Sequence, residues 1–201
     1  MSSNSRLAKT HIPHLAKRKI DKRVRKTRDA LGDALVTLMQ EKPFDSITVQ
    51  NVLDRANVGR STFYSHFSDK DDLLMSDADE FFEGMAMALS RHGDKSDRVF
   101  PVAEFFNHLI EARHFVKALR SSGRMNDNMD LAQSHFARGI EKRLGEIAKG
   151  SLIPVHERSA RAFAHAGALL ALMKWWIDRG MTEPPAEMDR LFHRMVWKET
   201  P

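Results

Sequence analysis

Two short helical patterns on either side of a tight turn constrain the fold of this chain more than any other feature. They lie in residues 44 to 74, FDSITVQNVLDRANVGRSTFYSHFSDKDDLL. In the first pattern Thr48 can cap a helix, because its hydroxyl can accept a hydrogen bond from the free backbone amides of the first turn. The apolar residues of that helix recur at i, i+3, i+4 and i+7 and predict one buried face: Val49, Val52, Leu53 and Ala56.

A turn with the sequence ANVG separates the two patterns. Asn57 tolerates a positive φ, and Gly59 is an acceptable N-cap, so a second helix is predicted from about Arg60. Phe63 and Phe67 are four residues apart and share its core side. The exposed faces then carry Arg60, Ser61, Thr62, Tyr64, Ser65 and His66. Such a surface has little structural reason to exist.

A third helix is predicted to start just after this surface. Ser68 is its expected cap, and Asp69, Asp71 and Asp72 fall in its first turn, where carboxylates suit the helix dipole. Lys70 is the odd residue in that turn. It stands where backbone amides and the dipole already favour a phosphate.

The run ITVQNVLDRANVGRSTFYSHFSDKDDLL closely resembles the helix-turn-helix signature of the TetR-type (TetR/AcrR) bacterial transcriptional regulators. Its Thr-Val start, Phe-Tyr-x-His-Phe centre and Lys-Asp-Asp-Leu-Leu end stand in register. The resemblance covers roughly residues 20 to 75. Near the C-terminus, WWIDRGM and PPAEM more weakly resemble the last helices of some family members. Asn57 and Pro43 depart from the commonest pattern, and neither blocks the fold.

We assign the exposed face of the second helix to double-stranded DNA. Base edges or adjacent phosphates are expected to meet Arg60, Ser61, Thr62 and Ser65. Tyr64 and His66 are assigned to the DNA backbone, and the family resemblance supports these two and Lys70 most directly. Thr48 has two interpretations, capping alone or capping combined with a phosphate contact. Arg60 also has two, because a guanidinium can grip guanine O6 and N7 or bind a phosphate.

Composition excludes several kinds of chemistry. The chain has 201 residues, 42% of them hydrophobic and none of them cysteine, so it can bury a core but has no disulfide, thiolate metal site or cysteine nucleophile. No catalytic motif and no His-Glu-x-x-His pattern stands out among the ten histidines. We therefore predict no enzyme, no cofactor and no metal. No apolar run is long enough for a bilayer, so no membrane partner and a cytoplasmic location are expected.

Charge is concentrated at the N-terminus. The formal net charge is +5, yet residues 1 to 28 hold ten Lys or Arg against Asp21 alone, which gives about +9 there and leaves about −4 for the rest. Residues 1 to 19 are predicted to be a basic arm along the phosphates or in the minor groove. The alternative is a solvated tail that keeps the protein soluble.

The fold class predicted for the whole chain is all-α. A helix-turn-helix DNA-binding domain is expected over residues 20 to 74, and a helical regulatory and dimerisation domain over residues 75 to 201. Helices are expected at 21 to 41, from near Asp69 to His92-Gly93, from Pro101 to the break at Ser121-Ser122-Gly123, from about Asp127 to Lys149, from Pro154 to about Arg179, and from about Pro185 to Trp197.

The family resemblance implies an effector cavity inside the helical body, for a small molecule that the sequence does not identify. Aromatic residues that permit an apolar pocket are Phe105, Phe106, Phe115, Phe136 and Phe163. A plain packed core explains the same residues about as well.

The segment FAHAGALLALMKWW is apolar nearly all round, which predicts a helix buried on two sides. One side can belong to a partner subunit, and with the last helix it would form a two-fold four-helix interface, as the resemblance also implies. The residues assigned to this homodimer interface are Gly167, Ala168, Ala171, Trp175, Leu191 and Met195. The alternative is a central helix of a monomeric bundle.

The sequence therefore predicts a homodimeric regulator that binds a palindromic operator, represses, and is relieved by a small molecule. A second class stays open, a TetR-like coactivator whose helical body binds a partner protein. A third, a small all-helical enzyme, would leave the exposed face of residues 60 to 66 and the basic tail unexplained.

Overall fold

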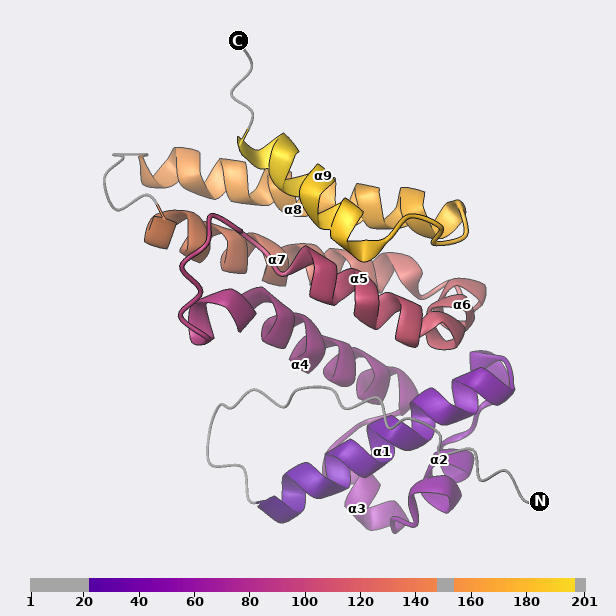
Figure 1. Ribbon diagram of the computed structural model, residues 1–201. Coiled ribbons are helices and arrows are strands. Elements are labelled where there is room, and N and C mark those ends of the chain that lie inside the picture. Colours follow the sequence, from indigo (N-terminus) through magenta and orange to yellow (C-terminus); the bar gives the residue numbers. More distant parts are fainter. Residues whose placement is uncertain (1–21, 148–153, 198–201) are drawn as a thin grey trace, which may run out of the picture.

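The computed structural model describes residues 22–147 and 154–197, and within these ranges the regular structure is helical (Figure 1). This agrees with the predicted all-α class. The elements are α1 Lys22–Glu41, the short 3-10 helix η1 Phe44–Ser46, α2 Val49–Ala56, α3 Arg60–Tyr64, α4 Lys70–Arg91, α5 Val102–Glu111, α6 Arg113–Ser121, α7 Met125–Ile147, α8 Val155–Asp178 and α9 Pro185–Trp197. The predicted arm, residues 1 to 19, lies outside the described residues.

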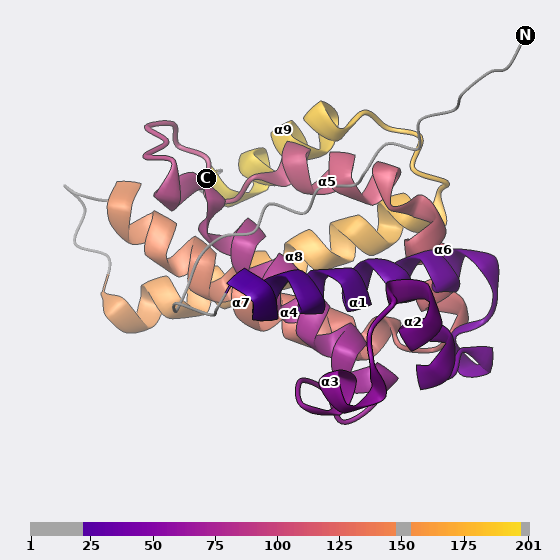
Figure 2. The ribbon, with the colours of Figure 1, turned by 90° about the horizontal axis from the view of Figure 1, so that it is seen from below.

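Two hydrophobic cores organise these helices. The smaller one joins α1, α2, α3 and the start of α4, with Leu31, Leu35, Val52 and Phe63 almost fully buried. The larger core lies among α4, α5, α7, α8 and α9. Figure 1 shows α1, α2 and α3 at one end of the molecule, α8 and α9 at the other, and α4 and α7 between them. Seen from below in Figure 2, α1 crosses α4 and reaches α6, and both pairs are in contact.

Helix α4 connects the two cores because it begins directly after the helix-turn-helix and continues into the body. Its first turns bury Leu73 and Leu74 in the smaller core, and Ala86 belongs to the larger one. Along the body α4 packs against α7, and α7 packs in turn against α8. Helix α4 thus links the helix-turn-helix to α7 and the body.

The single helix expected from Pro101 to Ser121 is wrong, because the chain divides into α5 and α6 at Ala112. Leu109 on α5 and Val116 on α6 are buried in the larger core, whereas Leu119, further along α6, is buried in the smaller one. The break lets α6 reach the helix-turn-helix end, and no glycine or proline marks it in the sequence.

Two features are absent from the described residues. No helix there combines the length and apolar character needed to cross a membrane. Nor do three or more potential His, Asp or Glu ligands gather there in a way that could hold a metal ion.

Candidate nucleic-acid interface

Helix α2 begins at the capping residue that the sequence predicts. The Thr48 hydroxyl accepts from the Asn51 amide at 3.2 Å, and the Thr48 amide donates to Asn51 Oδ1 at 3.1 Å. These reciprocal hydrogen bonds form a capping box, which fixes the start of the helix. Lys42 Nζ also donates to Asn51 Oδ1 at 2.6 Å and so ties the end of α1 to this cap. The capping role of Thr48 is confirmed, and its phosphate contact stays a prediction.

The turn between α2 and α3 has the expected backbone. Asn57 adopts the left-handed conformation with φ 53°, and its amide donates to Leu53 O. Gly59 is the N-cap of α3 in an extended conformation. A bidentate pair between Arg55 and Glu41 holds the end of α2 against α1, with distances of 2.9 and 2.7 Å. The hydrogen bond from Arg55 lowers the pKa of Glu41.

Helix α3 separates its residues as the pattern predicts. Phe63 and Phe67 are buried in the smaller core, and their ring centroids lie 5.8 Å apart. Six of the residues assigned to DNA lie on α3 and the turn after it: Arg60, Ser61, Thr62, Tyr64, Ser65 and His66. Five of these six are exposed, and His66 is partly exposed. Tyr64 is 50% exposed, which is unusual for an aromatic side chain beside two buried phenylalanines. Ser65 donates to Thr62 O at 2.7 Å and thereby closes the short helix.

Arg60 belongs to a hydrogen-bonded chain that starts on α2. Its guanidinium donates to Gln50 Oε1 at 3.1 Å, and Gln50 Nε2 donates to Asp54 Oδ1 at 2.8 Å. Gln50 thus orients Arg60 on the exposed surface. The sequence motifs described above do not single out Gln50. The signal available was its spacing of four from Asp54, which brings two polar side chains together on one helix face.

Lys70 has a different environment from the one expected. Its Nζ donates to Phe44 O at 2.7 Å and to Ile47 O at 2.8 Å, and lies 4.3 Å from the centroid of the Phe44 ring. Two of the three N–H donors of the ammonium group are therefore used within the chain. Lys70 joins the start of α4 to the turn that precedes α2, and its contact with DNA stays a prediction.

The predicted cap of α4 is wrong by one residue. Asp69 is the N-cap, because its side chain accepts from the Asp72 amide at 2.8 Å. Ser68 lies one position earlier, where its amide and its hydroxyl both donate to Asp72 Oδ2. Either residue type can cap a helix, and the sequence SD offers both next to each other.

The five phenylalanines assigned to an effector pocket do not share one cavity. Phe105, Phe106 and Phe136 are buried and pack ring against ring, with 5.2 Å between the centroids of Phe105 and Phe136. Phe115 packs against the smaller core, and Phe163 is 59% exposed on α8. Neither residue joins the packed rings of Phe105, Phe106 and Phe136. The chain turns at Ala112 and carries Phe115 away from the body core, and Phe163 lies on the outer side of α8.

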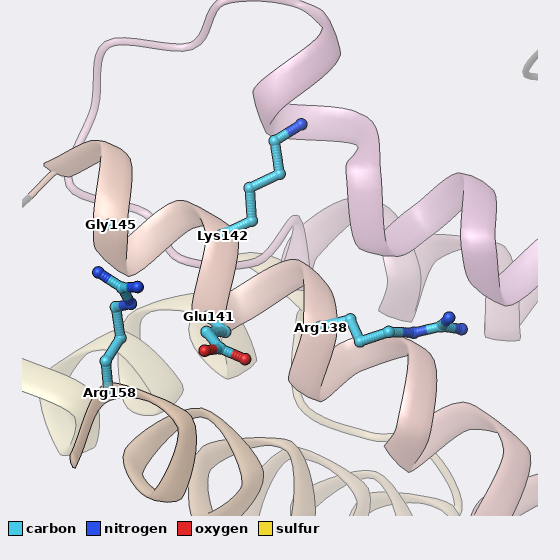
Figure 3. Close-up of a pocket in the computed structure, with 5 residues that line it drawn as sticks. All are labelled: Arg138, Glu141, Lys142, Gly145 and Arg158. Atoms are coloured by element: carbon cyan, nitrogen blue, oxygen red, sulfur yellow. The ribbon is translucent and has the colours of Figure 1, made fainter. Parts of the chain in front are cut away.

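Two surface hollows among the described residues are lined by none of these five phenylalanines. One, of about 10 Å³, lies between α1 and α4 beside Arg28 and Phe67. The other, of about 330 Å³, lies between α7 and α8 and is lined by Arg138, Glu141, Lys142, Gly145 and Arg158. Figure 3 shows Arg158 extending from α8 toward Gly145, while Arg138 and Lys142 extend in different directions from α7. This open, charged hollow is unlike the apolar effector cavity that the resemblance implies.

The residues assigned to a dimer interface lie on α8 and α9, at the opposite end from α3 (Figure 1). On α8, Ala171 is exposed, Trp175 is 44% exposed, and Gly167 and Ala168 are partly exposed. The other side of α8 is buried in the larger core through Leu169, Leu170, Met173 and Trp176. On α9, Met195 is 46% exposed and Leu191 is partly buried.

The geometry therefore defines a helix-turn-helix protein with a separate helical body. Residues 31–76 match the tetR family of bacterial regulatory proteins, and residues 102–198 match a transcriptional regulator C-terminal region. The chain belongs to the tetR family, which is a family of regulators and not of enzymes.

One curated relative is also similar to the chain over most of the chain's length. The chain is 36% identical over 185 residues to the uncharacterized HTH-type transcriptional regulator YxbF of Bacillus subtilis strain 168. The matched region covers 87% of this chain and 46% of YxbF. The chain thus spans about half the length of YxbF.

The solved structures support the fold alone, since both are less than 25% identical to the chain. The dihydroxyacetone kinase operon activator DhaS has a TM-score of 0.65 and 17% identity, over 85% of this chain and 93% of its own. A TetR transcriptional regulator from Streptococcus agalactiae 2603V has a TM-score of 0.61 and 24% identity, over 89% of this chain and 97% of its own.

Proposed function

We propose that the protein is a sequence-specific DNA-binding transcriptional regulator that binds a palindromic operator as a homodimer. The observation that carries this proposal is the exposed polar face of α3, whose apolar side is buried under Phe63 and Phe67. A helix of this kind fits the major groove of B-DNA, where side chains can contact base edges.

The exposed residues of α3 divide into two roles. Arg60 lies at the first position of α3 and is held by Gln50, so its guanidinium is presented on the surface at which bases would lie. A guanidinium that contacts guanine O6 and N7 discriminates against other bases by about 1 to 3 kcal/mol. Ser61, Thr62 and Ser65 supply further donors and acceptors, and we assign Tyr64 and His66 to the phosphate backbone.

The homodimer is supported by the outer face of α8. Small and aromatic residues that are exposed or partly exposed recur there at helical spacing: Phe163, Ala164, Gly167, Ala168, Ala171 and Trp175. The ion pair of Lys174 with Asp178 lies on the same side, near the C-terminal end of α8. Small residues let the backbones of two helices approach closely, and Phe163 and Trp175 add apolar area. Two copies joined through α8 and α9 would have a two-fold axis, and a dimer of this kind reads two half-sites about 34 to 36 Å apart.

Control by a small molecule, with repression in its absence, is the family's usual arrangement, and we propose it for this protein. An effector that prefers one conformation of the body would shift the positions of the two helix-turn-helix units. The candidate site among Phe105, Phe106 and Phe136 is filled, since Phe136 also lies 4.4 Å from Phe100 between ring centroids. A ligand there has to displace packed side chains.

The same packing favours a second candidate function. A body whose aromatic residues are packed together fits a regulator that binds a partner protein on its surface instead of a small molecule. Two experiments separate the candidates. Loss of DNA affinity on titration with a small molecule supports the first. Recovery of a protein partner that alters operator binding supports the second.

The proposal is tested by selecting binding sites from a random duplex library with the purified protein. The expected result is a palindrome with two half-sites one helical turn apart, bound by two protomers in sedimentation measurements. A selected site without symmetry, or a complex with one protomer, would overturn the homodimer. The absence of any selected sequence would overturn specific recognition.

A further inference from the structure

Helix α7 carries a line of buried polar residues along its contact with α4. Among the described residues, the buried polar or charged side chains are Asn128, His135 and Arg143, which are 4%, 5% and 5% exposed. They are seven and eight positions apart, so they lie on one face of α7. We call this face, together with the α4 residues that it contacts, the polar seam.

Each buried residue of the polar seam has a hydrogen-bond partner on α4 or just beyond it. Asn128 Nδ2 donates to Met75 Sδ at 3.9 Å, in addition to Arg124 O at 3.0 Å. His135 Nε2 lies 2.7 Å from Asp79 Oδ1. At the far end the Arg143 guanidinium binds the connection after α4, with 2.6 Å to Ser96 O and 2.9 Å to Arg98 O.

One tautomer of His135 satisfies the hydrogen bonds to both of its neighbours. An Arg138 guanidinium nitrogen lies 2.8 Å from His135 Nδ1, and a guanidinium can only donate, so Nδ1 accepts. The ring proton is then on Nε2, which donates to Asp79. His135 therefore connects a carboxylate of α4 to a cation of α7, and both of its nitrogens are used.

Contacts along the polar seam follow the same order on both helices. Asp71 pairs with Arg124 at 2.7 Å, Asp79 with His135, and Ala86 lies against Gly139. A Cβ atom on Gly139 would lie 2.3 Å from Ala86 O, so the backbones are in direct contact there. The two helices are thus parallel, with one register.

Buried polar contacts define that register more sharply than apolar contacts would. An apolar surface can slide by a fraction of a turn with little loss, whereas a buried donor or acceptor that loses its partner is left unsatisfied at a substantial cost. The polar seam should therefore hold α4 at one position and one tilt. Since α4 is the next helix after α3, that position also fixes where the exposed face of residues 60 to 66 lies, which we call the recognition face.

We infer that Asn128, His135 and Arg143 are positioning residues for operator binding: they hold α4 against the body and so set the half-site spacing that the dimer accepts. None of the three lies on the exposed face of α3, so they act on DNA only through α4. This inference rests on the proposed function.

The first test compares His135→Leu with His135→Gln on palindromes whose half-site spacing differs by one or two base pairs. The wild-type protein should prefer one spacing by about tenfold or more, because a misplaced half-site loses base contacts. His135→Leu should flatten this preference. His135→Gln should restore it, because the amide can donate to Asp79 and accept from Arg138. A flattened preference that glutamine does not restore would contradict the inference.

Ile140→Val provides the control for lost stability. Ile140 is buried on the neighbouring apolar side of α7 and makes no polar contact with α4. This variant should lower the melting temperature and bind all spacings more weakly, while the preferred spacing stays unchanged. If His135→Leu behaves like Ile140→Val, the role of His135 is only structural and the inference is wrong.

A second readout does not depend on DNA. The chain has no cysteine, so Asp54→Cys on α2 and Lys142→Cys on α7 can carry a pair of spin labels, diluted with unlabelled protein. The distance distribution between the labels should broaden in His135→Leu and return to the wild-type width in His135→Gln. An unchanged distribution would overturn the inference even if the DNA experiment could not be performed. If the wild-type protein selects no palindrome but the distribution broadens, the proposed function fails and the seam's positioning of α4 stands.

Discussion

The recognition face of α3 and the outer face of α8 are both exposed, yet their compositions are opposite. The face of α3 carries hydroxyl, imidazole and guanidinium groups around an exposed Tyr64. The outer face of α8 carries small residues with Phe163 and Trp175. They lie at opposite ends of the molecule, with α4 and α7 between them (Figure 1).

The difference indicates which kind of partner each face is suited to. Donors and a cation on a short exposed helix suit the phosphates and base edges of DNA. An exposed apolar stripe is costly in water and suits a protein surface. Neither face is needed by the fold, since the opposite sides of α3 and α8 supply the buried residues. The same comparison can be tested by changing one face at a time.

The largest effect is expected from a charge on the apolar face. Ala171→Glu places a carboxylate in the proposed dimer contact, where burying it would be unfavourable. The protein should sediment as a monomer, and its affinity for a palindromic duplex should fall by about 100-fold or more, because linked binding of two half-sites is lost. Ala186→Glu, on the opposite side of α9 from Met195, is the matched control and should remain dimeric. A dimeric Ala171→Glu variant would remove α8 from the interface.

On the polar face, Arg60→Ala should change specificity more than folding. The variant should lose preference for one base in each half-site, by about 1 to 3 kcal/mol, while the other positions keep theirs. Binding-site selection with the variant and the wild-type protein measures this directly. A variant that keeps the full wild-type preference would exclude Arg60 from base reading. Gln50→Ala should give a smaller change at the same base, because Gln50 orients Arg60.

A Lys70 variant tests whether the stability of the helix-turn-helix can be separated from the DNA contacts of α3. Lys70→Met keeps an unbranched side chain but removes the hydrogen bonds to Phe44 O and Ile47 O. We expect a loss of about 1.5 kcal/mol in the free energy of unfolding, together with weaker binding to all sequences alike. Unfolding in urea and anisotropy titrations measure the two effects. A weaker DNA affinity at unchanged stability would instead identify Lys70 as a phosphate contact alone.

The cap of α4 gives a smaller, purely local effect. Asp69→Ala should destabilise the helix start by about 1 kcal/mol, because the Asp72 amide loses its acceptor. Ser68→Ala should cost less, since the Ser68 amide still donates to Asp72. Equal losses for the two variants would show that Ser68 shares the capping role.

At the other end of the molecule, Asp189 should make stability depend on acid pH. Burial raises the pKa of Asp189, but the hydrogen bond from His193 and the nearby charges of His193 and Arg98 outweigh burial, so the pKa lies below its ordinary value. A lowered pKa stabilises the folded state above the unfolded pKa of about 4, and this contribution is lost as the pH falls below it. Melting temperatures between pH 5 and pH 3 should therefore fall less steeply in Asp189→Asn than in the wild-type protein. Equal slopes would contradict this.

The helix-turn-helix could be predicted from the sequence because its signals are local. The spacing of Val49, Val52 and Leu53, the cap at Thr48 and the turn at Asn57 all lie within ten residues of one another, and the structure confirms each of them. The cap of α4 was missed because Ser68 and Asp69 carry equivalent signals.

The body was harder to predict because its signals depend on contacts distant in sequence. A helix that is apolar nearly all round, such as α8, does not show which side faces its own core, so Phe163 was assigned to a pocket and lies on the surface. Ala112 gives no indication that the chain turns there. The polar seam was also missed, because Asn128, His135 and Arg143 look like ordinary surface residues until α4 is placed beside them.

The most direct test of the central claim is a salt-titrated pull-down of genomic DNA fragments with the wild-type protein, followed by sequencing of the fragments that stay bound. If the face of α3 reads sequence, one palindromic site should remain bound as the salt concentration rises, and the Arg60→Ala variant should lose that enrichment. Retention that does not depend on sequence and disappears smoothly with salt would contradict the account, because phosphate contacts alone would then explain the binding.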